Sequence, residues 1–194
     1  MKLERVLPFA RTLLEQAISP GDIAIDATLG NGHDTLFLAR LVGDSGRVYG
    51  FDIQDDALLS TKTQLMQHEL ADRVTLFHSG HENLSSCIPP IHYGKVTGAV
   101  FNLGYLPGGD KSIVTRPDTT ISAIEQLLDM LAPEGIIVLV IYHGHPEGAV
   151  ERDYLIRYVK QIDQARANIL LYQFLNQKNH PPFIVAIEKK NDLS

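Results

Sequence analysis

Short β-branched runs alternate with helix-like patterns along this sequence, and that alternation most constrains the fold. Apolar residues recur at three- and four-residue steps near the start, which predicts a helix over residues 2–18. A strand pattern follows at 23–27, and a second helical pattern runs through Leu36 and Leu41. The remaining expected strands are 47–53, 74–77, 99–103, 136–142, 169–174 and 183–188, and the remaining expected helices are 55–70, 119–131 and 150–162.

This order of elements predicts an α/β fold. Strands that alternate with helices pair in parallel through right-handed crossovers, which gives an open twisted sheet with helices on both faces. The last two expected strands are separated only by residues 175–182, too few for a helical crossover, so they should form an antiparallel hairpin at one side of the sheet. We expect one Rossmann-like domain over residues 1–194, with seven mostly parallel strands and no room for a second large domain.

Charge and cysteine content limit the classes of function. A net charge of −6 argues against a protein that coats nucleic acid through an overall positive field, although a local basic patch is compatible with it. The single cysteine, Cys87, forms neither an intrachain disulfide nor a four-cysteine metal site. Residues 1–19 carry charges and lack an apolar stretch long enough for a signal sequence or membrane span. A cytoplasmic protein without membrane contact is expected.

A glycine turn between the first expected strand and its helix is the strongest motif. Gly30 and Gly32 let the backbone approach a ligand closely, and the helix that follows offers it unpaired N–H groups. Asp52 ends the second strand 22 residues after Gly30, where a carboxylate can accept hydrogen bonds from both ribose hydroxyls. Together these residues predict an adenosine-type ligand. The alternative is a plain strand-to-helix turn, with Asp52 capping the next helix.

Two residues around this turn bear on the identity of the ligand. Thr35 stands where a dinucleotide-binding turn would favour a third glycine or an alanine. Asp26 would repel a diphosphate, but it suits the cationic ammonium and sulfonium groups of S-adenosylmethionine. A methyl donor is therefore favoured over NAD. Asp26 could also be a cap or a loop acceptor, and an NAD-binding oxidoreductase or a regulatory nucleotide-binding domain stays as an alternative.

A glycine-rich loop at residues 102–110 follows the fourth expected strand. In an open α/β sheet the ligand crevice lies beyond the carboxyl ends of the strands, so this loop should face the reactive end of the cofactor. Asn102 could accept hydrogen bonds from an amine, and Tyr105 could stack on a planar base. This arrangement suits methylation of nitrogen. The alternative is an exposed glycine-rich loop with a buried aromatic side chain.

Histidines and cations border the same expected crevice. His143 could take a proton from an attacking amine or hold a substrate oxygen, or it could be an ordinary turn histidine. His143 and His145 lie only two residues apart without further recognisable ligands, so no metal site is predicted. Cations that could pair with RNA phosphates, if the first helix packs across the mouth, are Lys2, Arg5, Arg11, Lys111 and Arg116.

These motifs resemble those of a known family. The segments that carry the resemblance are Asp26-Ala-Thr-Leu-Gly-Asn-Gly-His-Asp-Thr35, Phe51-Asp-Ile-Gln54, Asn102-Leu-Gly-Tyr-Leu-Pro-Gly-Gly-Asp-Lys111 and Tyr142-His-Gly-His-Pro146. The chain resembles class I S-adenosylmethionine-dependent methyltransferases over nearly its whole length, and more closely the bacterial family labelled rRNA methylase. The resemblance implies methylation of the 5-aminomethyl group of 5-aminomethyl-2-thiouridine at the wobble position of a tRNA anticodon stem-loop, with S-adenosyl-L-homocysteine as product. An rRNA or small-molecule acceptor is the alternative.

Site residues carried over from the resemblance form three groups. The cofactor group has a methionine side, a ribose side and an adenine side, and comprises Asp26, Thr28, Gly30, Asn31, Gly32, His33, Asp34, Asp52, Gln54, Ser79, His81 and Asn102. The expected substrate-binding residues are Leu103, Gly104, Tyr105, Gly108, Gly109, Lys111, Arg116, Tyr142 and His145. The expected catalytic residues are Asn102, Tyr105, Asp110 and His143. Leu103-Gly104 departs from the Asn-Pro-Pro-Tyr of many amino-methylating enzymes. An exposed face on the last hairpin could pair two copies in a homodimer.

Overall fold

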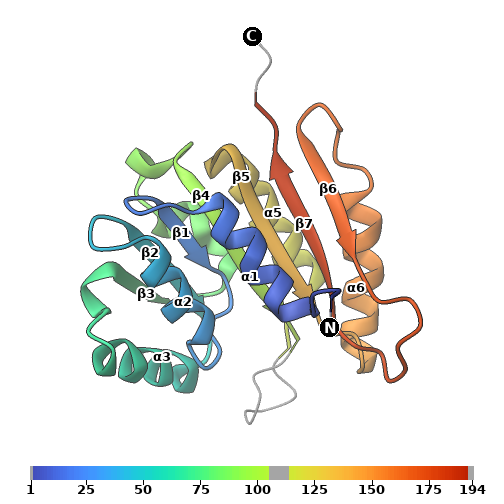
Figure 1. The fold of residues 1–194 in the computed structure, drawn as a ribbon, viewed down its shortest axis with the longest axis horizontal. Coiled ribbons are helices and arrows are strands. Elements are labelled where there is room, and N and C mark those ends of the chain that lie inside the picture. The colour runs from blue at the N-terminus through green and yellow to red at the C-terminus, as the bar shows by residue number, and fades with distance from the viewer. Residues whose placement is uncertain (1, 105–113, 192–194) are drawn as a thin grey trace.

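One seven-stranded sheet forms the centre of the computed structural model, which describes residues 2–104 and 114–191 (Figure 1). The strand order is β3-β2-β1-β4-β5-β7-β6. The strands are β1 (Ile23–Asp26), β2 (Arg47–Asp52), β3 (Val74–His78), β4 (Val96–Leu103), β5 (Leu131–Ile141), β6 (Ala167–Tyr172) and β7 (Phe183–Lys189).

The pairing of the strands confirms the expected fold class. Strands β1 to β5 pair in parallel, whereas β7 is antiparallel to both β5 and β6. The short connection between β6 and β7 therefore closes a hairpin, and β6 lies at the edge of the sheet.

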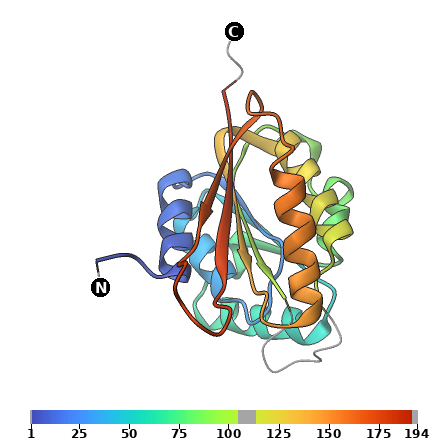
Figure 2. The ribbon, with the colours of Figure 1, turned by 90° about the vertical axis from the view of Figure 1, so that its right-hand side faces the viewer.

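Helices cover both faces of the sheet, and each face buries its own apolar core (Figure 2). One face packs against α1 (Val6–Ala17), α2 (His33–Leu41) and α3 (Asp55–Gln67), and the other against α4 (Leu84–Cys87), α5 (Pro117–Met130) and α6 (Pro146–Val159). Short 3₁₀ turns occupy Ala71–Arg73, His81–Asn83 and Pro90–His92. Within the described ranges, no helix is long and apolar enough to cross a bilayer.

Several element boundaries differ from the predicted ones. The first helix begins at Val6 instead of residue 2, and α3 ends at Gln67 because Glu69 takes up a positive φ of 56°. α6 begins four residues earlier than expected, since Pro146 occupies a first-turn position that suits proline. β5 begins at Leu131, directly after α5, with a shift in register before Ile136. Asp55 is the first residue of α3, with Gln54 as the N-cap.

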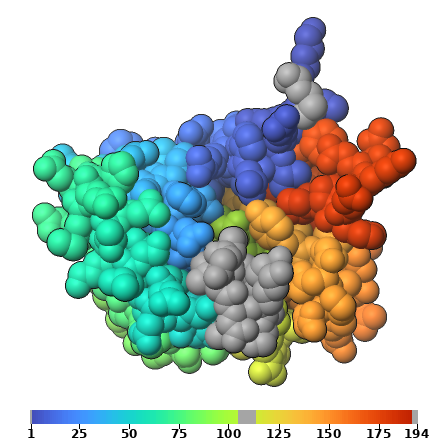
Figure 3. Space-filling model, turned by 90° about the horizontal axis from the view of Figure 1, so that it is seen from below, coloured from blue at the N-terminus to red at the C-terminus, as the bar shows by residue number. Residues whose placement is uncertain are grey.

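The carboxyl ends of the parallel strands lie together at one end of the sheet, on the side of the molecule that faces the viewer in Figure 3. β1 lies between β2 and β4, so the chain changes direction across the sheet at this point. In open α/β folds such a reversal leaves a crevice outside the strand ends. α1 packs over the same region against β4 and β5. The described residues that follow β1 and β5, together with Gly104 after β4, thus face α1.

Candidate active site

A cleft with two compartments lies at the carboxyl ends of the parallel strands. The large compartment, about 760 Å³, lies between α1 and residues at or just after the ends of β1, β4 and β5. The small compartment, about 280 Å³, lies beside the ends of β2 and β3. Both are lined by Thr28, Gly30, Asn102 and Gly104, so the two compartments meet at these residues.

The glycine turn forms the wall between β1 and α2. Gly30 and Gly32 have φ values of 53° and 82°, a region that glycine enters without steric cost. Gly32 is the N-cap of α2, and a β-carbon there would lie 2.9 Å from the backbone of Thr61. The close packing of α2 on α3 therefore requires glycine at this position. Asn31 and His33 line the large compartment beside the unpaired N–H groups at the start of α2.

Asp52 ties this turn to the end of β2. Its Oδ2 accepts a hydrogen bond from the backbone N–H of Gly30 at 3.1 Å, and its Oδ1 accepts one from the N–H of Gln54 at 3.0 Å. A carboxylate oxygen can accept two hydrogen bonds, so each oxygen keeps a free lone pair. Both Asp52 and Gln54 line the small compartment, as the ribose prediction requires. The carboxylate can hold the turn and still accept hydrogen bonds from a diol.

His81 and Ser79 form the far wall of the small compartment. The Nδ1–H of His81 donates to the carbonyl oxygen of Ala27 at 3.0 Å, while its Nε2 is buried and meets no partner in the described chain. Burial lowers the pKa of His81, so the ring is neutral at pH 7. With the proton on Nδ1, Nε2 is a hydrogen-bond acceptor that an outside donor can satisfy.

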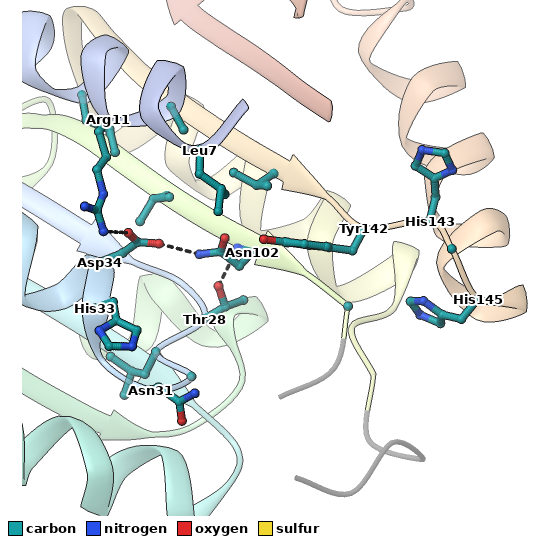
Figure 4. Close-up of a pocket in the computed structure, with 18 of the residues that line it drawn as sticks. Leu7, Arg11, Thr28, Asn31, His33, Asp34, Asn102, Tyr142, His143 and His145 are labelled. Carbon is teal, nitrogen blue, oxygen red and sulfur yellow. Dashed lines mark hydrogen bonds and ion pairs between the residues drawn. The ribbon is translucent and has the colours of Figure 1, made fainter. Parts of the chain in front are cut away.

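A polar network crosses the large compartment (Figure 4). The side-chain amide of Asn102 donates to Oδ2 of Asp34 at 2.7 Å, and Arg11 lies 3.5 Å from the other oxygen of the same carboxylate. The backbone N–H of Asn102 donates to the hydroxyl of Thr28 at 2.7 Å. Because an ionised carboxylate only accepts, Asp34 fixes the NH₂ end of the Asn102 amide. The carbonyl oxygen of Asn102 is then the acceptor left for a ligand.

Tyr142 completes this side of the large compartment. Its side chain points toward Asn102 in Figure 4, and burial together with the charge of Asp34 raises its pKa. Gly104 and His145 also line the large compartment, and their predicted contact with substrate stays a prediction. The side chain of Leu103, in contrast, is 1% exposed and packs in the core. The prediction that Leu103 contacts substrate is therefore wrong for its side chain, which is buried.

Asp26 also lies elsewhere than its predicted role requires. It is fully buried, lines neither compartment, and accepts hydrogen bonds from the hydroxyl of Thr35 at 2.6 Å and the N–H of Thr28 at 3.2 Å. Burial raises the pKa of Asp26 to about 7, with a further contribution from the charge of Asp34. Asp26 is thus a loop acceptor that braces the turn from behind. Asp34, not Asp26, is the carboxylate that faces the large compartment.

His143 is engaged on both sides of its ring. Its Nε2–H donates to the carbonyl oxygen of Pro181 at 3.0 Å, and its Nδ1 accepts from the guanidinium of Arg152 at 3.3 Å. Burial, first of all, lowers the pKa of His143. Both nitrogens are occupied and the cationic form is disfavoured, so the expectation that His143 takes a proton from the amine is corrected. Its contacts give it a structural role between α6 and the loop before β7.

The predicted cations are spread unevenly. Arg11 lines the large compartment and Arg116 lines the small one, where it is exposed and pairs with Asp118 at 3.5 Å. Lys2 and Arg5 are exposed and line neither compartment. The predictions for Tyr105, Gly108, Gly109, Asp110 and Lys111 fall outside the described residues.

Sequence reasoning missed a buried carboxylate that is connected to Gly104 by hydrogen bonds through Thr115. Glu151 is 2% exposed and accepts hydrogen bonds from the hydroxyls of Thr115, at 2.5 Å, and Thr120, at 2.8 Å. The Thr115 oxygen in turn accepts from the N–H of Gly104 at 2.9 Å. Burial raises the pKa of Glu151. The available signal was its spacing, because Glu151 shares the buried stripe of α6 with Leu155.

A metal centre finds no support in the geometry. Across residues 2–104 and 114–191, no three His, Cys, Asp or Glu side chains gather in a way that would hold a metal ion.

Comparison with known proteins assigns the family. The model of the family described as "Putative rRNA methylase" matches residues 48–188, most of the chain. The chain belongs to this family. A crystal structure of a "putative rRNA-methylase" from Clostridium thermocellum is 43% identical, with a TM-score of 0.93 over 97% of this chain and all of that one. The family resemblance predicted from the motifs is therefore confirmed.

Two further relatives of this chain carry more specific descriptions. A "putative methyltransferase" from Streptococcus mutans, solved in complex with SAH, is 38% identical, with a TM-score of 0.87 over 96% of this chain and 99% of that one. A protein of Arabidopsis thaliana named "tRNA (mnm(5)s(2)U34)-methyltransferase, chloroplastic" is 37% identical over 190 residues. That match covers 94% of this chain and 69% of the plant protein.

Proposed function

We propose that this protein is an S-adenosylmethionine-dependent N-methyltransferase that methylates the 5-aminomethyl group of 5-aminomethyl-2-thiouridine at the wobble position of tRNA. The observation that carries the proposal is the carbonyl oxygen of Asn102, which lies at the meeting point of the two compartments and has no hydrogen bond to any of the described residues. The name of the plant relative supports the choice of tRNA as acceptor.

The residues of the cleft fit the methyl donor. The glycine turn lets the backbone approach a ligand closely, and Asp52 keeps lone pairs for a ribose diol. The acceptor Nε2 of His81 suits the amino group of an adenine. The SAH complex of the Streptococcus mutans relative supports the same ligand class. When bound, S-adenosylmethionine supplies an electrophilic methyl group on a positively charged sulfur.

Asn102 and Asp34 position the acceptor. The amine must be neutral, because an ammonium has no lone pair with which to attack. The Asn102 carbonyl accepts one N–H of the amine and so directs its lone pair toward the junction with the small compartment. Methyl transfer to this amine would give a methylated ammonium, with the electron pair of the broken carbon–sulfur bond left on the sulfur of S-adenosyl-L-homocysteine, and the ammonium would lose its extra proton to water. Positioning is therefore the main contribution of these side chains.

The large compartment would hold the acceptor base. Leu7 and Leu14 of α1 form part of its apolar wall, and Tyr142 presents an aromatic face with a hydroxyl. Apolar walls with a few polar groups suit a planar, unstacked base from an anticodon loop. The RNA ligand expected here is thus a single-stranded loop on a stem.

A homodimer forms part of the proposal. β6 is the edge strand of the sheet and exposes Leu170. An unpaired strand edge with apolar side chains is a ready pairing surface. Light scattering should give twice the chain mass, and a monomer at working concentration would remove this part of the proposal.

Methyl transfer to defined acceptors tests the function. Labelled S-adenosylmethionine should transfer its methyl to tRNA that carries 5-aminomethyl-2-thiouridine, but not to the same tRNA without the aminomethyl group. Ribosomal RNA and the free nucleoside serve as the alternative acceptors. Transfer to either of these and not to the tRNA would exclude the proposed substrate. A melting temperature raised by NAD and unaffected by S-adenosylmethionine would exclude the methyltransferase class altogether.

A further inference from the structure

A groove of about 650 Å³ runs along the outer side of the molecule between α6 and β6. Figure 2 faces this edge, with α6 on the right and β6 and β7 on the left. Arg152, Arg157 and Lys160 line it from the side of α6, and Leu171 and Gln173 line it from the side of β6. We refer to it as the α6–β6 groove.

Positive charge dominates the α6–β6 groove, although the whole chain is acidic. Asp153 is the one carboxylate among its lining residues, and it is bound by Arg152 at 2.8 Å. Arg157 and Lys160 are exposed and form no ion pair with any residue that the structure describes. Arg157 lies over the ring of Tyr154 at 5.9 Å, which leaves its guanidinium N–H groups free to bind an anion.

The groove begins at the large compartment. His143 lines both, and it accepts a hydrogen bond from Arg152 at 3.3 Å. From Arg152 to Lys160 the chain follows α6 for eight residues, so the cations form a line of about 12 Å that leads away from the compartment. A polyanion whose base entered the large compartment would therefore meet Arg152 first, then Arg157 and Lys160.

We propose that the α6–β6 groove binds the phosphate backbone of the RNA strand that leaves the large compartment. This inference rests on the proposed function, because it takes the acceptor base to be part of an RNA. Phosphate contacts fix the register of a nucleic acid without reading its sequence. The groove would thus orient the stem while the large compartment selects the modified base. It gives an acidic single domain a local cationic surface for RNA.

A charge-neutral double variant tests the groove. In R157Q/K160Q both unpaired cations become polar amides, and R157K/K160R keeps both charges. K95Q/K190Q removes the same charge at the end of the sheet away from the cleft, where β4 begins and β7 ends. The probe is an anticodon stem-loop RNA that carries 5-aminomethyl-2-thiouridine, and its Kd is measured by fluorescence anisotropy over a series of salt concentrations.

The proposal predicts a change in salt dependence. For R157Q/K160Q, the slope of log Kd against log salt should fall by about 1 to 2, and RNA binding at low salt should weaken about tenfold. R157K/K160R and K95Q/K190Q should keep the wild-type slope. Melting temperature and SAH affinity show whether each variant is folded.

The RNA-binding measurement tests the groove, and the methyl-transfer measurement tests the proposed function. Either hypothesis can therefore fail without the other. If R157Q/K160Q binds the stem-loop with the Kd and slope of K95Q/K190Q, the groove does not contact RNA and the inference is overturned. That result would leave the groove for a protein partner. If the slope falls but the wild-type protein methylates no RNA, the groove inference stands and the proposed function is withdrawn.

Discussion

The two compartments of the cleft are built in different ways. The small compartment is formed at the ends of neighbouring strands, where Asp52 is held by two backbone N–H groups and His81 by a backbone carbonyl. The large compartment joins side chains from distant parts of the chain, with Arg11 from α1, Asn102 from β4 and Tyr142 after β5. Backbone anchoring suits a ligand that is always the same, whereas a wall of side chains can be adapted to a particular acceptor. Damage to one compartment should therefore spare the other.

The largest effect is expected at Asn102, where the compartments meet. Asn102→Ala removes the acceptor that orients the amine, so the single-turnover methylation rate should fall by about 10²–10³-fold. SAH affinity, measured by calorimetry, should change little, because the hydrogen-bonding groups of Asp52 and His81 stay in place. Asn168→Ala, at an exposed asparagine of β6, is the control. An unchanged rate for Asn102→Ala would refute the positioning role.

Asp26 tests the bracing behind the glycine turn through pH. Its pKa is about 7 in the folded chain and 3.8 ordinarily, so the folded state binds more protons than the unfolded state between these values. The free energy of unfolding should therefore fall as pH rises from about 4 to 7, by an amount on the order of a few kcal/mol for this group. Asp26→Asn should flatten that decline in urea denaturation series. The exposed Asp56→Asn is the control, and equal slopes for both variants would contradict the prediction.

Asp52→Ala should damage the small compartment selectively. Loss of hydrogen bonds from a charged acceptor costs about 1.5–3 kcal/mol, so SAH affinity should fall by roughly 10- to 100-fold. The Kd for the stem-loop RNA should stay near the wild-type value. Asp56→Ala, four residues along the chain and exposed, removes the same charge without touching the cleft. Matching losses in RNA and SAH affinity would show that the compartments are not independent.

The smallest effect is expected at the rim of the large compartment. Arg11 is 48% exposed and lies 3.5 Å from Asp34, and exposed ion pairs contribute about 0.2–1 kcal/mol. Arg11→Gln should slow methyl transfer by about two- to fivefold and leave SAH affinity unchanged. Arg5→Gln, which alters an exposed cation outside both compartments, should have no effect. A loss as large as that of Asn102→Ala would mean that Arg11 contacts the acceptor directly.

The same contrast explains what could be predicted from the sequence. The strand alternation, the short link before β7 and the glycine turn are local patterns, and each gave a correct element. Asp52 could be placed because strand ends in a parallel sheet share one edge. The small compartment was therefore largely foreseen.

Contacts between distant residues were not foreseeable in this way. An acidic residue at the end of β1 suggests a cation site, but Asp26 is completely buried and accepts a hydrogen bond from the hydroxyl of Thr35. A histidine after β5 suggests a base, but the carbonyl of Pro181, which comes from the loop before β7, occupies its Nε2–H. Such pairings depend on tertiary packing, for which the sequence offers no periodic signal.

Glu151 has a consequence for how this scaffold can be altered. Its carboxylate accepts a hydrogen bond from the hydroxyl of Thr115, and the Thr115 oxygen accepts one from the N–H of Gly104. One buried group of α6 therefore holds both Gly104 and Thr115, which are far closer in space than the segment between them is long in sequence. Substitution of Glu151 would accordingly release Gly104, after β4, and Thr115, before α5, in a single step.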